Sequence, residues 1–323
     1  MLTEVGVDIH KAVELLTKGE VVALPTETVY GLAANALNES AVSKIYQAKN
    51  RPSFNPLIIH LAESTPLAEY AQDIPEEAHI LAKAFWPGPL TLLLPKRSTV
   101  PDLVTAGSAI VAIRIPAHPL IQAVLAHTHF PLAAPSANPS GYISPTSASH
   151  VKRQLDGRIP YILDGETSHV GVESTIVGFQ DGQVTIYRYG GVSEEEIESI
   201  LGKKLQTNLH SHSPQSPGML KSHYAPGLPL HLGEIPQLLK QFAGRRIGVI
   251  SFKTSYVHED IAVQYILSPQ GELDQAASNL FSMLHKMDQN DVELILAERV
   301  PNEGVGKAIN DRLTRATAEF KGK

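Results

Sequence analysis

The sequence predicts an α/β protein built from two domains. Its 323 residues exceed what one average domain requires. Short apolar runs alternate with segments of helical periodicity, and a stretch rich in His, Ser, Pro and Gly separates two such regions. We therefore expect a larger domain at residues 1–205, a linker at 206–229 and a smaller α/β domain at 230–323.

The first domain should contain strands at residues 21–24, 57–61, 90–94 and 110–115, where apolar runs are bounded by turn residues. A helix is predicted to begin after Asn38, which can cap it, because Val42, Ile45 and Tyr46 follow at helical spacing. Its end would deliver Lys49 to the loop that follows. Proline and glycine recur through the rest of this region, so much of it is expected to be fixed loop.

The second domain is predicted to have buried strands at residues 246–252 and 292–300, an amphipathic helix at 273–287 and a closing helix at 305–320. The linker contains several prolines, so we expect it to be extended and fairly stiff. It could then lie across a surface.

Composition narrows the class of protein. Hydrophobic residues make up 43% and charged residues 19%, which is typical of a folded globular chain. No apolar run is long enough to span a bilayer, and Glu4, Asp8 and Glu14 stand where a signal peptide would carry cations, so we expect a cytoplasmic protein with no membrane association. The lack of cysteine excludes disulfides, thiolate zinc sites and cysteine nucleophiles.

The charge distribution argues against bulk attraction to nucleic acid. The net charge is −6, and residues 1–205 carry 15 Lys and Arg against 21 Asp and Glu, whereas the remainder carries 12 of each. Nucleic-acid binding of the general kind rests on a basic face. Any anion bound here must be held by a few well-placed cations.

The common motifs for nucleotides and metals are absent. Gly304, Gly306 and Lys307 lack the upstream glycine and following hydroxyl residue of a phosphate loop, and the third glycine of a dinucleotide site. There is no GxSxG or HExxH motif. The paired histidines at 127/129 and 210/212 are interpreted as surface residues in loops, and no metal site is expected from dedicated protein ligands.

Four segments place polar and charged groups where loops usually carry plain turn residues: residues 25–32, 49–60, 114–116 and 134–141, joined downstream by residues 144, 173–175 and 187–190. Together they supply four cations and several loop hydroxyls, which is a combination suited to a polyanion such as a nucleoside triphosphate. Each arginine by itself could equally pair with an acidic residue on an ordinary surface. The cations are Lys49, Arg51, Arg114 and Arg188, and the hydroxyls Thr28, Ser136, Ser144 and Ser174.

Three residues of this region have competing interpretations. Glu27 could be a base or a metal ligand, but a structural role such as capping a helix is favoured. Trp86 is favoured as a core residue over a platform for a base. His60 ends an apolar strand, and by itself would more often be a satisfied core histidine than a ligand-binding one.

Seven motifs in order resemble the YrdC family: LPTETVYGL, KNRPSFNPL, FWPGPLTLLLP, IRIP, APSANPSG, GVESTIV and IYRYGG. The resemblance that they carry covers about residues 8–204. The linker sequence SPGMLKSHYAP and the region after it resemble the two-domain, Sua-type threonylcarbamoyl-AMP synthases of that family. The resemblance thus extends to nearly the whole chain.

The resemblance implies a fold and a reaction. The fold would be a YrdC-like twisted open sheet around a concave, positive cavity, with a smaller Rossmann-like C-terminal domain. The reaction would join L-threonine, bicarbonate and ATP into threonylcarbamoyl-AMP with release of pyrophosphate, the first step of N6-threonylcarbamoyladenosine formation in tRNA. Mg²⁺ would accompany ATP, and a downstream tRNA threonylcarbamoyl transferase would take the product, with tRNA bound only weakly or indirectly.

The resemblance also implies roles for individual residues. Lys49, Arg51, Ser136 and Asn138 form the family's KxR and SxN signature and would be catalytic. The expected ATP contacts are Arg51, Asn55, Ser136, Ser144 and Arg188. The expected threonine contacts are Thr28, His60, Arg114, Ala134 and Ser174. One further family contact to ATP falls near Ile110, whose side chain is unsuited to it.

The linker residues His223 and Tyr224 are predicted to close over the cavity as a lid, because a stiff segment ending in an aromatic side chain could exclude water. Two other functions remain open. An RNA-binding module is opposed by the charge distribution and by the lack of aromatic residues on a basic face. A carbamoyl-transferring maturation enzyme would normally add a zinc-finger module, which a chain without cysteine cannot form.

Overall fold

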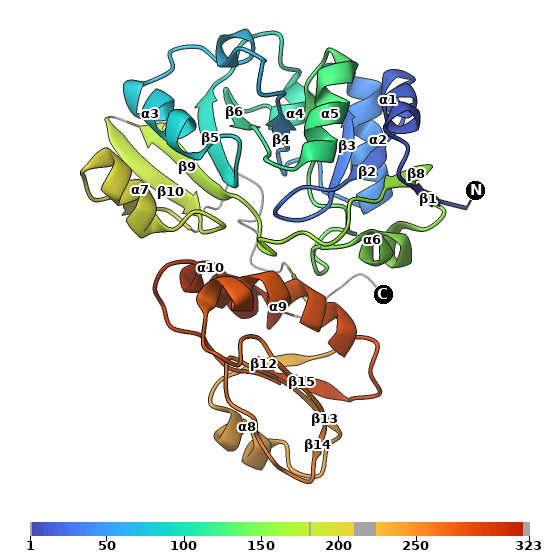
Figure 1. Cartoon of the computed structure of the whole chain (residues 1–323), viewed down its shortest axis with the longest axis vertical. Helices are drawn as coiled ribbons and strands as arrows, with labels where there is room; N and C mark the ends of the chain where they lie inside the picture. Colours follow the sequence, from blue (N-terminus) through green and yellow to red (C-terminus); the bar gives the residue numbers. More distant parts are fainter. Residues whose placement is uncertain (1, 181, 210–223, 319–323) are drawn as a thin grey trace.

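A computed structural model describes residues 2–180, 182–209 and 224–318. The described residues form two units, each built on its own β-sheet. The larger unit, with its sheet and helices, lies above the smaller unit in Figure 1. This arrangement confirms the predicted α/β fold class.

The larger sheet has eleven strands of mixed direction. In spatial order they are β1 (Glu4–Gly6), β8 (Tyr161–Leu163), β2 (Val22–Leu24), β3 (Gly31–Asn35), β7 (Leu132–Ala133), β4 (Ile58–His60), β6 (Ile110–Arg114), β5 (Leu90–Pro95), β9 (Thr175–Gln180), β10 (Gln183–Arg188) and β11 (Gln206–Thr207). The last strand, β11, pairs in parallel with β10. The predicted linker therefore begins as part of this sheet.

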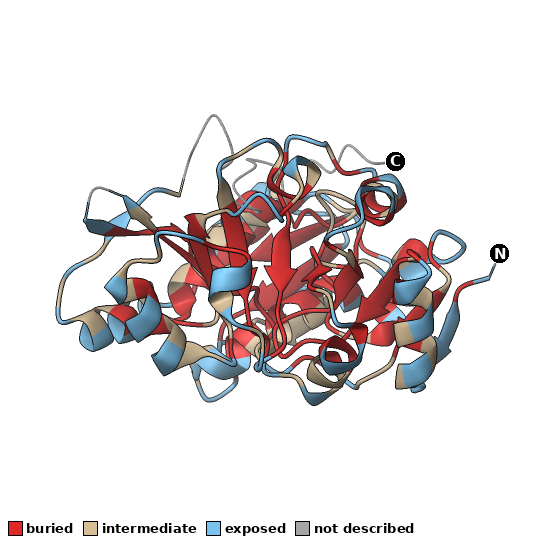
Figure 2. Cartoon of the chain, turned by 90° about the horizontal axis from the view of Figure 1, so that it is seen from above, coloured by how far each residue is buried: buried red, intermediate tan, exposed pale blue. Residues whose placement is uncertain are grey.

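Helices cover the larger sheet and leave its central strands buried (Figure 2). They are α1 (Ile9–Thr17), α2 (Glu39–Lys49), the short 3₁₀ helix η1 (Leu67–Glu69), α3 (Glu76–Phe85), α4 (Asp102–Thr105), α5 (Pro119–Thr128), α6 (Ala148–Leu155) and α7 (Glu194–Leu201). As predicted, α2 begins after Asn38, whose side chain accepts a hydrogen bond from the backbone N–H of Ala41.

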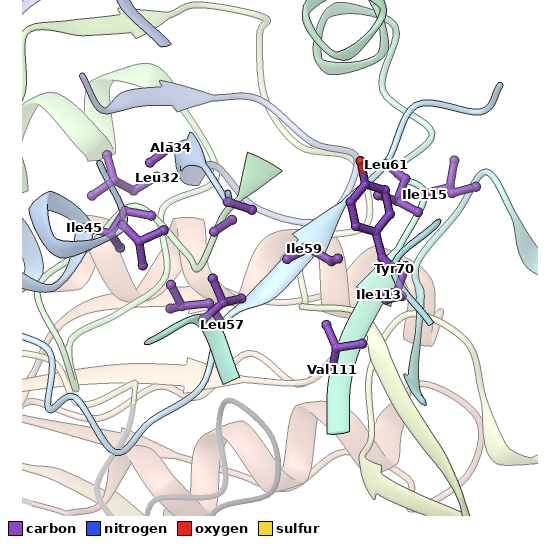
Figure 3. Close-up of a cluster of buried hydrophobic side chains, with 14 of the residues drawn as sticks. Leu32, Ala34, Ile45, Leu57, Ile59, Leu61, Tyr70, Val111, Ile113 and Ile115 are labelled. Atoms are coloured by element: carbon purple, nitrogen blue, oxygen red, sulfur yellow. The ribbon is translucent and has the colours of Figure 1, made fainter. Parts of the chain in front are cut away.

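A continuous apolar core lies between the sheet and these helices. Leu57 and Ile59 from the β4 segment, Ile113 from β6 and Ile45 from α2 are all fully buried in one cluster (Figure 3). Burial of each of these apolar side chains stabilises the fold by about 1.5–3 kcal/mol. The ends of the strands that carry them are therefore fixed in space. Loops that leave those strand ends are consequently anchored on a rigid support.

The smaller unit is a four-stranded parallel sheet in the order β12 (Leu230–Leu232), β15 (Leu294–Ala297), β13 (Ile247–Ser251) and β14 (Ile261–Ile266). Three helices accompany it: α8 (Ile235–Gln241), α9 (Leu273–Met287) and α10 (Gly306–Ala316). A parallel sheet with crossover helices is the Rossmann-like arrangement that the resemblance implied. The strands predicted at residues 246–252 and 292–300 correspond to β13 and β15, and α9 has the predicted bounds.

Helices α9 and α10 lie between the small sheet and the larger unit (Figure 1). Val29, Ile143 and Val172 of the larger unit belong to the same buried apolar cluster as Phe281 of α9. The contact is close at Gly171, where a Cβ atom would lie 2.4 Å from the backbone oxygen of Ala277. The two units therefore share a packed interface. In the described part of the chain, no helix is both long and apolar enough to cross a membrane.

Candidate active site

A cavity in the larger unit gathers most of the residues singled out in the sequence. Arg51, Arg114, Ser136 and Arg188 all line this one cavity. They come from segments as distant in sequence as the ends of α2 and β10. The full lining is Thr28, Val29, Arg51, Ile58, His60, Arg114, Ala134, Pro135, Ser136, Glu173, Ser174, Arg188 and Tyr224.

The strand register explains how two of these side chains meet. His60 ends β4 and Arg114 ends β6, and parallel pairing places the two residues directly opposite each other. Burial, together with the charge of Arg114, lowers the pKa of His60 to about 3, so its ring is neutral near pH 7. Its buried Nδ1 atom has no hydrogen-bond partner among the described residues. A ligand group could satisfy that atom.

Arg114 is held by three partners in the cavity wall. Its Nε donates to the backbone oxygen of Gly88 at 3.1 Å, its Nη1 to Oγ1 of Thr28 at 3.0 Å, and its Nη2 to Oε1 of Glu27 at 2.6 Å. These bonds use three of the five guanidinium N–H groups. Two N–H groups are left for an anionic ligand.

The contact with Glu27 corrects the expectation that this residue caps a helix. Both members of the ion pair are buried, with side-chain exposures of 4% for Arg114 and 2% for Glu27. Burial pushes the pKa of the Glu27 carboxyl upward, but the Arg114 charge and hydrogen bonds from Arg114 and the backbone together outweigh it and hold the pKa below its ordinary value. Glu27 is thus a buried carboxylate that orients Arg114.

Arg51 and Arg188 are fixed by backbone oxygens. Arg51 donates from Nε to Asn55 at 3.1 Å and from Nη2 to Pro56 at 2.7 Å, while Arg188 donates from Nε and Nη2 to the Ser174 oxygen at 3.0 and 2.9 Å. Burial is the main cause that lowers the pKa of Arg51 to about 10, which still leaves it charged at neutral pH. Neutral carbonyls orient these guanidinium groups without cancelling their charge.

The KxR and SxN signature residues have two different placements. Arg51 and Ser136 line the cavity, but Lys49 and Asn138 do not, and Lys49 instead lines a second cavity of about 720 Å³. The Nζ of Lys49 donates to the backbone oxygens of Ser136 and Asn138, and Nδ2 of Asn138 donates to the oxygens of Pro139 and Tyr142 at 2.9 and 2.8 Å. In this structure, Lys49 and Asn138 therefore hold the loop that presents Ser136.

Two other predicted ATP contacts also lie outside the lining. Ser144 is fully buried and donates from Oγ to Oε1 of Glu173 at 2.6 Å. Asn55 is fully buried, and neither atom of its side-chain amide has a partner among the described residues. An unsatisfied buried amide costs about 1–3 kcal/mol, so a ligand that bonds Asn55 would recover that energy. The predicted threonine contacts Thr28, His60, Arg114, Ala134 and Ser174 all line the cavity.

Tyr224 closes one side of the cavity. It is 1% exposed, and its ring stacks on Phe281 with centroids 5.5 Å apart. The free volume beside it is about 40 Å³, room for a few water molecules only. A nucleotide can enter only if part of the wall moves. The other predicted lid residue, His223, lies outside the described residues.

Trp86 and Ile110 lie outside the cavity lining. Trp86 is half-buried against the main core and donates from Nε1 to the Leu90 oxygen at 2.7 Å, as expected for a core residue. Ile110 lies at the start of β6, and its N–H is bonded to Ser108.

The predicted loop position of His127 and His129 is wrong. His127 lies in α5, not in a loop, and His129 caps the end of that helix, whereas residues 210 and 212 fall outside the described part. Among the described residues, no three or more His, Asp or Glu side chains could share a metal ion.

Sequence reasoning missed Arg312, whose Nε donates to Oε2 of Glu173 at 2.8 Å. A signal was present, because Arg312 interrupts the apolar face of α10 formed by Ile309, Leu313 and Ala316. A charged residue at such a position is buried and needs a partner.

Comparison with known proteins shows the family. Residues 14–190 match the family model described as "Telomere recombination", named for Sua5, YciO and YrdC, and residues 192–318 match "Threonylcarbamoyl-AMP synthase, C-terminal domain". The threonylcarbamoyl-AMP synthase of Bacillus subtilis is 45% identical over 95% of this chain and 92% of its own length. This chain belongs to the threonylcarbamoyl-AMP synthase family.

Two solved structures of the family align with nearly the whole chain. The Pyrococcus abyssi Sua5 complex with L-threonine superposes with a TM-score of 0.89 at 41% identity, covering 96% of this chain and 94% of that one. A double variant of the same protein, with a histidine and the following tyrosine changed to alanine, gives 0.90 at 38% identity over 98% and 96%. The two-domain architecture expected of a threonylcarbamoyl-AMP synthase is confirmed.

The buried Glu173 carboxylate predicts a pH dependence of stability. Burial raises its pKa, but Arg312, Arg188 and a hydrogen bond from Ser144 lower it to about 2 overall. Because the folded pKa is depressed, the stabilisation is complete above the ordinary value near 4.5 and declines as pH falls toward 2. Glu173→Gln should therefore reduce the free energy of unfolding by about 3 kcal/mol at pH 7, and by progressively less between pH 4.5 and 3.

Urea unfolding of wild type and Glu173→Gln at several pH values measures this difference. A gap between the two proteins that stays constant from pH 7 to pH 3 would show that the pKa of Glu173 is the same in the folded and the unfolded protein, and would contradict the lowered pKa.

Proposed function

We propose that this chain forms L-threonylcarbamoyl-AMP and pyrophosphate from L-threonine, bicarbonate and ATP. The observation that carries the proposal is the convergence of Arg51, Arg114 and Arg188 with loop hydroxyls in one buried cavity. Family membership supports it, since relatives that match the full length of the chain are threonylcarbamoyl-AMP synthases.

The threonine half of the site would be formed around Arg114. Its two remaining N–H groups can fork onto the amino-acid carboxylate, a geometry that suits arginine. Thr28 and the neutral ring of His60 lie in the same lining and offer further hydrogen bonds. The P. abyssi relative crystallised with L-threonine supports this assignment of ligand class.

The ATP half would be formed by Arg51, Arg188, Ser136 and Asn55, with Ser144 behind the wall. The amine of threonine and bicarbonate first condense to a carbamate, with loss of water. One carbamate oxygen then attacks the α-phosphorus of ATP, and the bond to the β-phosphate oxygen breaks as pyrophosphate leaves. Two anions must meet, and fixed guanidinium groups lower that repulsion and stabilise charge that develops on the phosphate oxygens.

Mg²⁺ would arrive on the phosphates of ATP and supply further positive charge to them. The carboxylates of the cavity are not arranged as a cage for it, because Glu27 is paired with Arg114 and Glu173 with Arg312. The phosphates and water would therefore provide its ligands, as is usual for Mg²⁺.

The product is an activated carbamoyl group, so an acceptor enzyme must consume it. We propose a downstream tRNA threonylcarbamoyl transferase in the cytoplasm as that enzyme, with tRNA binding this chain weakly or only through the transferase. The acidic balance of residues 1–205 supports this division, because it opposes tight binding of a polyanion along the surface.

Tyr224 is proposed to act as a lid. The segment that follows it is tied to the larger unit, because Ala225 donates its N–H to the Gly141 oxygen at 3.0 Å. Displacement of Tyr224 would enlarge the cavity for ATP, and its return would exclude water from the activated product. His223 and Tyr224 form the only His-Tyr pair in the sequence, which supports a likeness to the pair altered in the P. abyssi variant.

The reaction itself can be tested by pyrophosphate release from ATP and Mg²⁺ with labelled threonine. Release should require both threonine and bicarbonate. Arg51→Ala should raise KM for ATP, and Arg114→Ala KM for threonine, each by about 10- to 100-fold, because a hydrogen bond to a charged group contributes roughly 1.5–3 kcal/mol. Arg158→Ala, an exposed arginine outside this cavity, is the control.

Release without threonine would overturn the proposed reaction. An Arg51 variant that changes only the threonine dependence would instead show that the two halves of the site are assigned the wrong way round.

The lid role of Tyr224 makes a separate prediction. Tyr224→Ala should lower coupling between ATP consumption and product, because water reaches the activated carbamoyl group, while Tyr224→Phe should retain most coupling. The ratio of pyrophosphate released to threonylcarbamoyl-AMP recovered measures this. Equal ratios in wild type and Tyr224→Ala would contradict a lid.

A further inference from the structure

Arg312 of α10 is the one arginine of the smaller unit that reaches the wall of the candidate active site in the described part of the chain. Its side chain is 0% exposed. Burial of a guanidinium group costs several kcal/mol unless its N–H groups are bonded. Its three nitrogen atoms are therefore expected to have specific partners.

Those partners connect it to two segments of the cavity wall. Nε donates to Oε2 of Glu173 at 2.8 Å, and Nη2 donates to the backbone oxygen of Tyr189 at 2.7 Å. Nη1 donates to Asp311 of its own helix at 2.7 Å. Tyr189 directly follows Arg188, and Glu173 directly precedes Ser174, whose backbone oxygen Arg188 bonds.

Arg312 also contacts the lid. Its Cζ lies 4.9 Å from the centroid of the Tyr224 ring, which places the cation over the aromatic face. The same ring stacks on Phe281 of α9. The closed position of Tyr224 is consequently set by the smaller unit.

Glu173 would oppose ATP if it were left alone. It lines the cavity, and its carboxylate is the nearest acidic group to Ser144, whose Oγ donates to it. Arg188 also acts on this carboxylate electrostatically. Without Arg312, Arg188 would be the main cation acting on Glu173. Its charge would then be compensated by this carboxylate and would attract phosphate less strongly.

A second contact from the smaller unit reaches the same place. His285 of α9 lies with Nε2 at 3.1 Å from the Ser144 backbone oxygen, and its ring stacks on His150 with centroids 4.1 Å apart. Both the side chain and the backbone of Ser144 are thus linked to the smaller unit, through Arg312 by way of Glu173 and through His285 directly.

We propose that Arg312 is a positioning residue for ATP: it neutralises Glu173, orients the walls that carry Ser144 and Arg188, and supports Tyr224 in the closed position. This inference rests on the proposed function, because it assumes that ATP occupies the half of the cavity next to Arg188. It gives the smaller unit a role in the reaction, as the source of the cation that keeps the nucleotide half of the site positive.

The test is a double-mutant cycle in the full chain. Arg312→Met keeps the length and burial of the side chain but removes the charge, so ATP affinity should fall about tenfold or more, while threonine affinity changes less than about threefold. Adding Glu173→Gln removes the unpaired carboxylate and should restore most of the ATP affinity. Titration calorimetry with a non-hydrolysable ATP analogue, and separately with threonine, measures both affinities without turnover.

Arg315→Met is the matched control. Arg315 lies on the same helix, is similarly buried and bonds to the same Asp311, and its Nη2 donates to the backbone oxygen of Leu209 at 3.2 Å. It should leave ATP affinity within about threefold of wild type. If Arg312→Met does not fold, Arg312→Lys is the second variant. It keeps a charge beside Glu173 without the planar fork, so it should weaken ATP binding while threonine binding is retained.

The outcomes separate the inference from the proposed function. Equal losses of ATP and threonine affinity in the Arg312 variants, with no rescue by Glu173→Gln, would show a purely structural role and overturn the inference. Absence of threonine-dependent pyrophosphate release in the wild type would overturn the proposed function, whatever the affinities of the variants.

Discussion

The fold has to bury several cations around one cavity, and the rest of the structure depends on how it does so. Arg51, Arg114 and Arg188 are all less than 9% exposed, and moving each out of water costs several kcal/mol. The chain offsets that cost largely with backbone oxygens from its loops, as at Gly88, and with few carboxylates. Carbonyl oxygens satisfy the N–H donors but leave the net charge in place, so the cavity stays attractive to anions.

The same constraint explains the irregular loops around the large sheet. A carbonyl is most available to a cationic side chain where the chain leaves a strand or helix, because inside those elements one of its two lone pairs is already bonded to an N–H. The proline-rich segments at residues 52–56 and 135–139 supply such carbonyls: that of Pro56 accepts from the guanidinium group of Arg51, and that of Ser136 from the Nζ of Lys49. Anchored on a rigid apolar core, these loops hold the cations in fixed directions before any ligand binds.

The sequence predicted much of this because the signals were local. The Asn38 cap predicted the start of α2, and apolar runs predicted β2, β4, β5 and β6. The periodicity of residues 273–287 predicted α9. Ordered motifs identified residues that do line the cavity. Long-range pairing was not readable in the same way: nothing local shows that Lys49 faces the 136–138 carbonyls, that Glu27 pairs with Arg114, or that Arg312 crosses between the two units to Glu173.

A crystal structure of the full chain with L-threonine and a non-hydrolysable ATP analogue tests the central assignment most directly. We expect the threonine carboxylate on Arg114 and the triphosphate within hydrogen-bond distance of Arg51 and Arg188. A second cavity of about 720 Å³ lies alongside, lined in part by Arg153 and Arg158. Phosphates bound there, with the first cavity unchanged, would contradict the placement of the active site.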